Sequence, residues 1–194
     1  NVVIKDLTIT SQSLTAISYS YSKCINLNTN CKNIAIDNCW LKGVNLPTTY
    51  TTHAHVAFFS DKKIIKNLRI NNCLFTGGSH AIYFNANNAS DVSINNNTFD
   101  STDNYGVYFS NTSFSSFDNN TIAQRISNTV QPVNYFGIYM TGCNGNITNN
   151  CIKSIKDIQR INFTGIFEEI NGVEEILKKD PANVYADMTY KTKE

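Results

Sequence analysis

Residues 93–100 read SINNNTFD, a run of three asparagines between an isoleucine and a Thr-Phe pair. Asparagine has a low propensity for the interior of strands and of helices. It is also one of the few residues besides glycine that adopt the left-handed backbone conformation of a tight corner. The stretch therefore predicts two short strands joined by an asparagine corner, rather than one damaged strand.

The same pattern recurs along the chain. Five segments align on it: NIAIDNCWL (33–41), NLRINNCLF (67–75), DVSINNNTF (91–99), FSSFDNNTI (114–122) and GNITNNCI (145–152). One aligned column is apolar and holds Ile36, Ile70, Ile94, Phe117 and Ile147. An asparagine always follows two residues later, at Asn38, Asn72, Asn96, Asn119 and Asn149. The N-terminal LTITSQSL (7–14) fits with Ile9 in the apolar column and Ser11 in place of the asparagine. The repeat unit is short, and insertions lengthen some of its copies. Such a repeat predicts a solenoid.

A second set of strand-like segments alternates with the first. It reads VAFF (56–59), AIYF (81–84), GVYF (106–109), GIYM (137–140) and GIFE (165–168). The two-residue period predicts strands. The inward column is expected to hold Ala57, Ile82, Val107, Ile138 and Ile166, and the outward column Phe58, Tyr83, Tyr108, Tyr139 and Phe167. No interior segment has helical periodicity, so the fold class is all-β, with three short strands per coil and about six stacked coils, a parallel β-helix.

The motif I-x-N-N-x-(T/C)-(F/I) followed by G-I-Y-(F/M) resembles the right-handed parallel β-helix repeats of the pectate-lyase-like superfamily. The resemblance covers about residues 1–170 and implies a single-stranded solenoid over residues 1–168. It implies a stacked structural ladder at the corner, formed by Asn38, Asn72, Asn96, Asn119 and Asn149. It also implies that the first strands line a groove where related enzymes hold substrate. Because that superfamily holds lyases, hydrolases, adhesins, phage tailspikes and non-catalytic proteins, the likeness is informative for fold rather than for activity.

The repeat decays near the end of the chain. Residues 168–181 read EEINGVEEILKKDP, with acids first, lysines last and a proline after them, an order that suits a short helix. Residues 169–194 are therefore expected to be a C-terminal cap, which would include this helical segment, or the start of another module. The chain opens on Asn1 in a strand-like stretch without a signal peptide, so we expect it to be a piece of a longer protein.

Bulk composition narrows the classes of partner. The chain has 194 residues, 29 of them asparagine, and a net charge of +1. A charge this small argues against a nucleic-acid partner, which needs a basic surplus or stripe. No apolar run reaches the roughly 18–20 residues of a membrane span. Six cysteines without a C-x-x-C pair argue against a zinc ribbon and favour buried free thiols over disulfides.

The outward aromatic column is the leading candidate for ligand binding. Phe58, Tyr83, Tyr108 and Tyr139 would form a row of rings able to receive sugar faces. The alternative is a purely structural stack in which the rings contact one another. An insertion over residues 42–55 is expected to bring Tyr50 and His55 beside the groove, and a second insertion at 125–135 is expected on the same side in later coils. Either these loops form the sides of the groove, or they are surface loops that the fold merely tolerates.

The histidines form a second candidate. His55 aligns with His80 on the next coil, and His53 shares a face with His55, so the three could cluster and bind zinc. Tyr105 and Phe136 fill the same column in later coils, which favours aromatic stacking at that position. No metal site is assigned.

Catalysis finds little support in the pattern. A polysaccharide lyase needs a base, usually with calcium held by acids, and a glycoside hydrolase needs paired carboxylates. The outward first-strand positions carry rings instead, so no catalytic residue is assigned. Whether the protein is an enzyme stays open, and no cofactor is expected, apart from calcium if it is a lyase.

The sequence thus predicts an extracellular, cell-surface or virion-associated β-helix that engages a polysaccharide or cell-surface glycan along the first-strand groove, without strong catalysis. One alternative is a polysaccharide lyase or a glycoside hydrolase. The other is a structural spacer or trimeric spike shaft, in which three copies would form a homotrimer.

Overall fold

The computed structural model describes residues 1–11, 23–44, 56–124 and 134–153, and adds the backbone of three further strands. These are β15 (Asn162–Ile170), β16 (Val173–Ile176) and β17 (Val184–Ala186). Throughout this part of the chain the protein is all-β, with no helix. The strands form two sheets, of ten and seven strands.

The larger sheet runs through the whole stack. Its order is β1 (Val2–Lys5), β4 (Cys31–Asp37), β6 (Val56–Asn71), β8 (His80–Asn95), β10 (Tyr105–Asp118), β12 (Asn134–Thr141), β15 and β16. Two short strands join it from the side: β3 (Ile25–Leu27) pairs with β6, and β13 (Asn144–Thr148) pairs with β10. Every pairing in it is parallel except that of β15 with β16.

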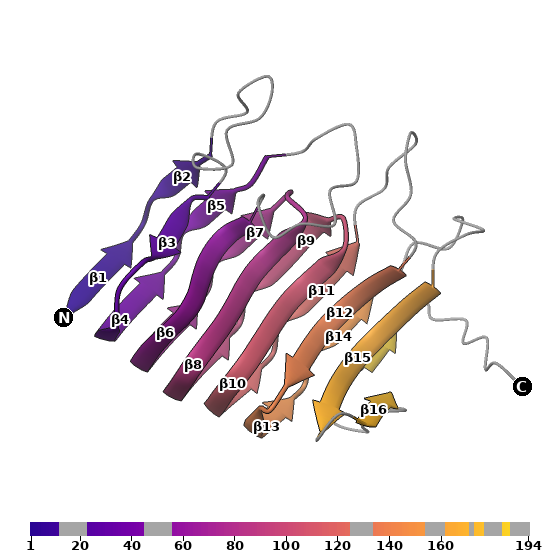
Figure 1. Cartoon of the computed structure of the whole chain (residues 1–194). Coiled ribbons are helices and arrows are strands. Elements are labelled where there is room, and N and C mark those ends of the chain that lie inside the picture. Colours follow the sequence, from indigo (N-terminus) through magenta and orange to yellow (C-terminus); the bar gives the residue numbers. More distant parts are fainter. Residues whose placement is uncertain are drawn as a thin grey trace, which may run out of the picture.

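The smaller sheet faces the larger one across the core. Its order is β17, β14 (Cys151–Lys153), β11 (Thr121–Gln124), β9 (Thr98–Thr102), β7 (Leu74–Thr76), β5 (Trp40–Lys42) and β2 (Thr8–Thr10). All of its pairings are parallel. Figure 1 shows the repeats following one another from the N-terminus to β15.

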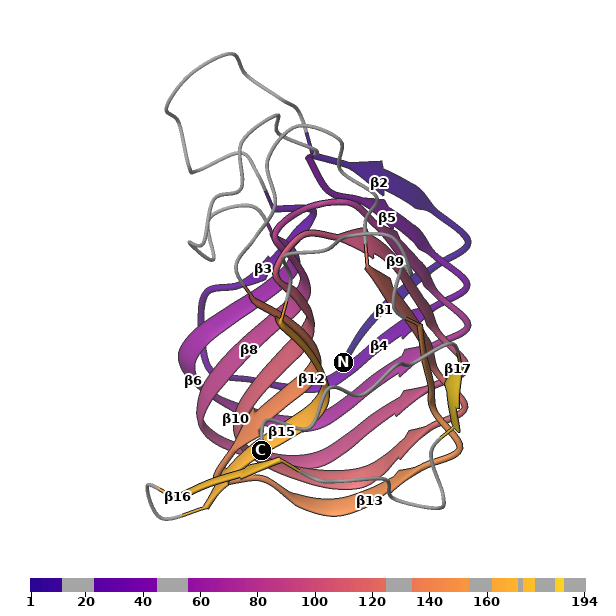
Figure 2. The same cartoon turned by 90° about the vertical axis from the view of Figure 1, so that its right-hand side faces the viewer.

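Each long strand of the larger sheet bends, so its two halves lie in two different walls of the stack. In β6 the residue at the bend is Lys62, and in β10 it is Asn111, both in the left-handed conformation (φ 53° and 50°). Each long strand therefore has a first leg before the bend and a second leg after it. Viewed along the stack, the first legs form one wall, the second legs form the base, and the smaller sheet forms the opposite wall (Figure 2). The arrangement is compatible with a β-helix-like solenoid.

The predicted apolar column is confirmed. Strand register pairs Ile36 with Ile70, Ile70 with Ile94, Ile94 with Phe117, and Phe117 with Ile147. The first repeat was predicted wrongly, because Ile4 pairs with Ile36, whereas Ile9 lies in the smaller sheet opposite Leu41. Ile4 and Ile9 both sit in alternating strand-like stretches, so the pattern alone did not separate them.

The predicted asparagine corner is confirmed as a backbone feature. The five corner asparagines have φ between 51° and 57°, and their side chains are exposed: Asn38, Asn72, Asn96, Asn119 and Asn149. In the first repeat Asp6, with φ 57°, takes this place instead of Ser11. An aspartate tolerates the left-handed conformation for the same reason as an asparagine.

The ladder itself lies one residue later than predicted. Asn97, Asn120 and Asn150 are at most 1% exposed and stack in line. Asn97 Nδ2 donates to Asn120 Oδ1 at 3.1 Å, and Asn120 Nδ2 donates to Asn150 Oδ1 at 3.0 Å. The corner asparagines cannot do this, because the left-handed residue points its side chain out of the core. Four of them donate there to nearby carboxylates, as Asn149 does to Asp118.

Two cysteines continue the ladder into the earlier repeats. Asn97 Oδ1 accepts from the backbone N–H of Cys73 at 2.8 Å, and the N–H of Cys39 points at Cys73 Sγ at 3.5 Å. The thiol of Cys73 contacts the carbonyl of Ile36 at 3.7 Å, the place where Asn97 Nδ2 binds the carbonyl of Ile70 at 3.0 Å. Both cysteines are free, as are Cys24, Cys31, Cys143 and Cys151.

The helical segment expected over residues 168–181 is wrong where the structure describes it. β15 continues to Ile170, and Val173–Ile176 forms β16, which pairs antiparallel with β15. Backbone pairing with the adjacent strand outweighs the weak helical pattern of this segment.

Candidate functional site

The outward ring in the third repeat is Phe59, and not Phe58 as predicted. Register pairs Phe58 with the core residue Ile82 and Phe59 with Tyr83. Phe58 is fully buried and lies 6.2 Å, between ring centroids, from the core ring Phe84. The sequence offers two adjacent phenylalanines, and the choice between them depends on where the strand enters the stack.

The outer face of the first legs carries a continuous row of stacked rings. Ring centroids are separated by 5.4 Å from Phe59 to Tyr83, by 4.8 Å from Tyr83 to Tyr108, and by 5.0 Å from Tyr108 to Tyr139. The interplanar angles lie between 9° and 13°. Parallel strands set this spacing, because equivalent side chains on neighbouring strands lie about 4.8 Å apart.

A second column of rings runs beside the first. His80, Tyr105 and Phe136 stack at 4.5 Å and 5.1 Å. The two columns meet edge to face, as between Tyr105 and Tyr108 at 6.0 Å. Both arrangements are favourable for aromatic quadrupoles. We call the two columns together the aromatic strip: Phe59, Tyr83, Tyr108, Tyr139, His80, Tyr105 and Phe136.

Stacking decides which part of each ring a ligand can reach. Because the rings lie face to face along the stack, the faces of Tyr83 and Tyr108 are covered by their neighbours, and only the edges of these half-buried rings are left for a ligand. Burial raises the pKa of Tyr83 and Tyr105, and it raises the pKa of Tyr108 to about 12. The hydroxyls therefore stay protonated at neutral pH and act as hydrogen-bond donors and acceptors.

Charged and amide groups border the N-terminal end of the strip. Lys23 Nζ lies 3.6 Å from the centroid of the Phe59 ring, a cation–π contact. Burial lowers the pKa of Lys23, and the nearby carboxylate of Asp61 works in the opposite direction. Asn85 Nδ2 donates to Asp61 Oδ1 at 2.8 Å. The aromatic strip thus begins beside the ammonium group of Lys23. Asp61 and Asn85 form a polar border between the strip and the bend.

The backbone behind the strip is closely packed. Tyr135 is fully buried, its hydroxyl lies 3.1 Å from Thr102 Oγ1, and burial raises its pKa. A Cβ added at Gly106 would lie 2.3 Å from Cγ2 of Ile122 and 2.5 Å from the carbonyl oxygen of Gly137. Only a glycine fits here against Ile122 and the next strand, so packing on the core side fixes the backbone that carries Tyr105 and Tyr108.

The structure uses His80 as a stacking ring. It is 3% exposed, its Nδ1 lies 2.9 Å from Ser79 Oγ, and it stacks on Tyr105. Its register partner is Val56, which contradicts the predicted alignment of His80 with His55. The predicted site residues Tyr50 and His55 lie outside the described residues, and so do His53 and most of both insertions. Within the described ranges no three His, Cys, Asp or Glu side chains are grouped to hold a metal ion.

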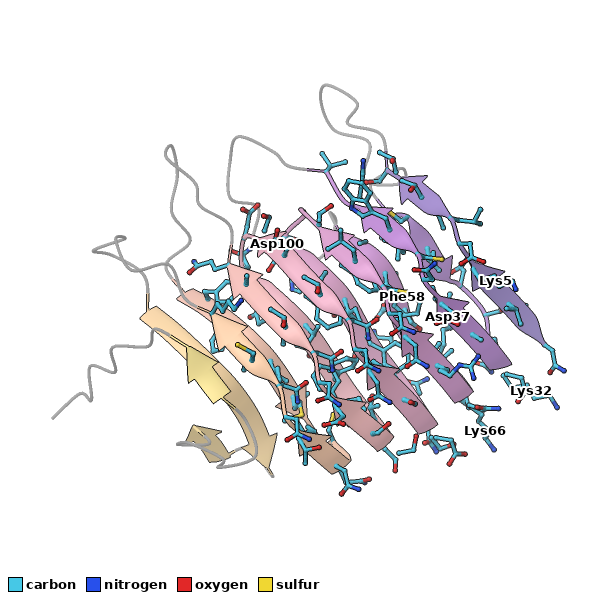
Figure 3. All side chains as sticks on the ribbon, turned by 180° about the vertical axis from the view of Figure 1, so that it is seen from behind. Lys5, Lys32, Asp37, Phe58, Lys66 and Asp100 are labelled. Atoms are coloured by element: carbon cyan, nitrogen blue, oxygen red, sulfur yellow. The ribbon has the colours of Figure 1, made fainter. Side chains whose placement is uncertain are left out.

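Charge is distributed unevenly along the stack. Residues 70–124 contain no lysine or arginine, whereas the first three repeats carry most of the described cations. Figure 3 shows Lys5, Lys32 and Lys66 towards the N-terminal end of the stack, extending away from the ribbon, and register places Asp37 beside Lys5. Register places Lys32 directly beside Lys66. The aromatic strip therefore runs from a basic end into uncharged and acidic repeats.

No family model, no curated protein and no solved structure matches the chain. In the portion described, the structure also contains no helix of the length and apolar character needed to cross a membrane.

Proposed function

We propose that the chain is a right-handed parallel β-helix of about six coils, of the pectate-lyase-like kind, that binds polysaccharide along the aromatic strip. Parallel register between equivalent residues of successive repeats supports the architecture. We place the protein outside cells, on a cell surface or on a virion, where such a polymer is met.

One observation carries the binding proposal: a regular row of tyrosine edges. Tyr83, Tyr108 and Tyr139 present hydroxyls on neighbouring coils, and stacking holds their rings in place before any ligand arrives. Binding to a rigid surface loses little side-chain entropy, and tyrosine supplies large amphipathic contact area at low entropic cost. A polymer lying along the strip would exchange hydrogen bonds between its hydroxyls and this row. The contact would be made at ring edges rather than by sugar rings stacked on ring faces.

The same chemistry argues for binding rather than turnover at the strip. A general base works best with a pKa near the operating pH. The pKa of Tyr108 is raised to about 12, so this phenol is a poor base at neutral pH. The proposal therefore assigns no lyase or hydrolase step, and no calcium, to these residues.

The second candidate is a structural spacer or trimeric shaft. It is favoured by the mutual coverage of the ring faces, which stabilises the sheet whether or not a ligand binds. The two candidate functions predict different results for a variant that lacks a ring edge. Polysaccharide binding is lost if the strip binds a ligand, whereas only stability changes if the chain is a spacer.

A glycan array tests the proposal. The protein is applied to immobilised neutral and acidic polysaccharides beside three variants: Tyr83→Ala, Tyr108→Ala and, as a control, Ile64→Ala. Ile64 is 41% exposed and lies outside the strip. We expect both tyrosine variants to lose signal on every polysaccharide that the unchanged protein binds, and the Ile64 variant to keep it. A blank array for the unchanged, folded protein would favour the spacer.

A further inference from the structure

We infer that the chain has a second binding site, for the ring of an uncharged saccharide, in an open depression beside Trp40. Its lining residues lie where β1, β4 and β6 lead into β2, β5 and β7, and Figure 2 shows this corner across the core from the first legs. It is lined by Asp6, Leu7, Thr8, Asn38, Cys39, Trp40, Asn72 and Leu74. The inference does not depend on the aromatic strip, because no residue is shared between the two.

The size of the depression suits one or two sugar rings. Its volume is about 320 Å³, at the lower end of the range for small-molecule sites. Its lining is mostly polar, and the apolar side chains form the smaller part of it. The apolar part comes from Trp40, Leu7 and Leu74, and Leu7 is 53% exposed.

Trp40 is an exposed ring that is nevertheless held in place. It is 38% exposed, and its Nε1–H donates to Thr76 Oγ1 at 3.0 Å. Lys42 Nζ lies 3.4 Å from the ring centroid and covers part of one face. These two contacts fix the orientation of the indole, so its remaining surface is a preformed apolar plate.

The rim of the depression presents hydrogen-bond acceptors. Asp6, Asn38 and Asn72 occupy successive corner positions with φ between 51° and 57°, which fixes the direction of each side chain. Asn38 Nδ2 donates to Asp6 Oδ1 at 2.8 Å, and Asn72 Nδ2 donates to Asp37 Oδ1 at 3.3 Å. With their amide hydrogens turned towards carboxylates, both asparagines direct their Oδ1 atoms elsewhere. Nothing among the described residues donates to those two oxygens.

The indole of Trp40 beside a row of hydrogen-bond acceptors favours one chemical class of ligand. A saccharide has C–H groups that pack on an indole and hydroxyls that donate to amide oxygens. A cationic ligand on the same ring would be repelled by the ammonium group of Lys42. An anionic ligand would be repelled by the carboxylate of Asp6 at the rim. Lys42 would in turn attract the anion and Asp6 the cation, so neither sign of charge gains from both groups, and an uncharged, hydroxyl-rich ring is favoured.

The single tryptophan of the chain makes the site directly observable. Because Trp40 is the only tryptophan, the intrinsic emission at long excitation wavelength reports on this depression alone. The full chain is titrated with cellohexaose, maltohexaose and an oligogalacturonate. We expect a saturable change in emission with at least one neutral oligosaccharide and none with the oligogalacturonate.

Matched variants separate this site from the strip and from folding. The double variant Asn38→Gly, Asn72→Gly keeps both left-handed corners and removes two acceptors, so we expect affinity to fall about tenfold. Asn119→Gly makes the same change far from Trp40 and should leave the titration unchanged, as should Tyr108→Ala. The inference is overturned if no neutral probe gives a saturable change, if the oligogalacturonate binds as well, or if Asn119→Gly weakens binding as much as the double variant.

Discussion

The side-chain amide of Asn97 donates to Oδ1 of Asn120 at 3.1 Å, and both residues are at most 1% exposed. The same oxygen accepts the backbone N–H of Asn97 at 3.0 Å. Each ladder asparagine thus satisfies a backbone donor of the repeat before it. This arrangement lets a polar residue be buried in every later repeat without an unpaired group at the corner.

Replacing a ladder residue should cost far more than replacing a corner residue. In Asn120→Leu the buried N–H of Asn97 loses its acceptor, whereas Oδ1 of Asn150 keeps the backbone N–H of residue 120. We expect the free energy of unfolding to fall by roughly 1–3 kcal/mol for this stranded group. Asn96→Gly is the control, because it keeps the left-handed corner and removes an exposed side chain. Urea midpoints compare the two variants, and equal losses would refute the ladder as placed here.

Extending the ladder by one asparagine should stabilise the protein. The thiol of Cys73 is a weak donor and reaches the carbonyl of Ile36 only at 3.7 Å. In Cys73→Asn an amide would take that bond and offer an oxygen to the N–H of Cys39. We expect a higher urea midpoint, with a gain of about 0.5–1.5 kcal/mol.

A substitution at Cys151 is the control for the loss of a thiol in Cys73→Asn. Cys151 pairs in register with Thr121 on the smaller sheet, outside the ladder. Cys151→Thr should leave the midpoint near that of the unchanged protein. A drop in stability for Cys73→Asn would show that the site lacks room for the larger side chain.

Gly106 should tolerate no side chain. Its Cβ would lie 2.3 Å from the Ile122 side chain and 2.5 Å from the Gly137 carbonyl, so Gly106→Ala forces the backbone apart. We expect a loss of about 1–3 kcal/mol, measured by thermal or urea unfolding. Ala81→Gly, in the preceding repeat, removes a methyl group and should cost less. Wild-type stability for Gly106→Ala would mean that the two ring columns are not held as described.

Alkaline pH should weaken the fold through its tyrosines. Burial raises the pKa of Tyr108 to about 12, above the value of 10.0 in an unfolded chain. Below pH 10 both states hold the proton and the full stability is present. Between pH 10 and 12 only the folded state holds it, so stability is lost as the pH rises. The urea midpoint should therefore fall less for Tyr108→Phe than for the unchanged protein between pH of about 9 and about 11.5. Identical curves would contradict the half-buried position of this phenol.

The sequence pattern was sufficient to predict the repeat. It was not sufficient to decide which of two adjacent residues of the same type faces the core. The apolar column and the left-handed corners follow from residue types that only those positions accept. Asn96 and Asn97 are the same residue with opposite roles, and only burial separates them. A signal was nevertheless present, since the position after each corner is Cys39, Cys73, Asn97, Asn120 or Asn150, all small residues with a donor.

The choice between Phe58 and Phe59 has a similar explanation. Phe59 and Tyr83 each lie 13 residues before a corner asparagine, Asn72 and Asn96, so the match between these two repeats favours Phe59, although the offset is 11 for Tyr108 and 10 for Tyr139. The depression beside Trp40 had no such signal, because it is assembled from three repeats and depends on side-chain directions.

The most direct test of polysaccharide binding by the strip is a calorimetric titration comparing Tyr108→Phe with the unchanged protein, using a polysaccharide that the array identifies. Tyr108→Phe keeps the ring stack and removes one hydroxyl from the exposed edge. We expect affinity to weaken by about two- to tenfold, the value of one hydrogen bond. Unchanged affinity in Tyr108→Phe, combined with lost affinity in Tyr108→Ala, would contradict the account by showing that the ligand needs the ring and not its hydroxyl.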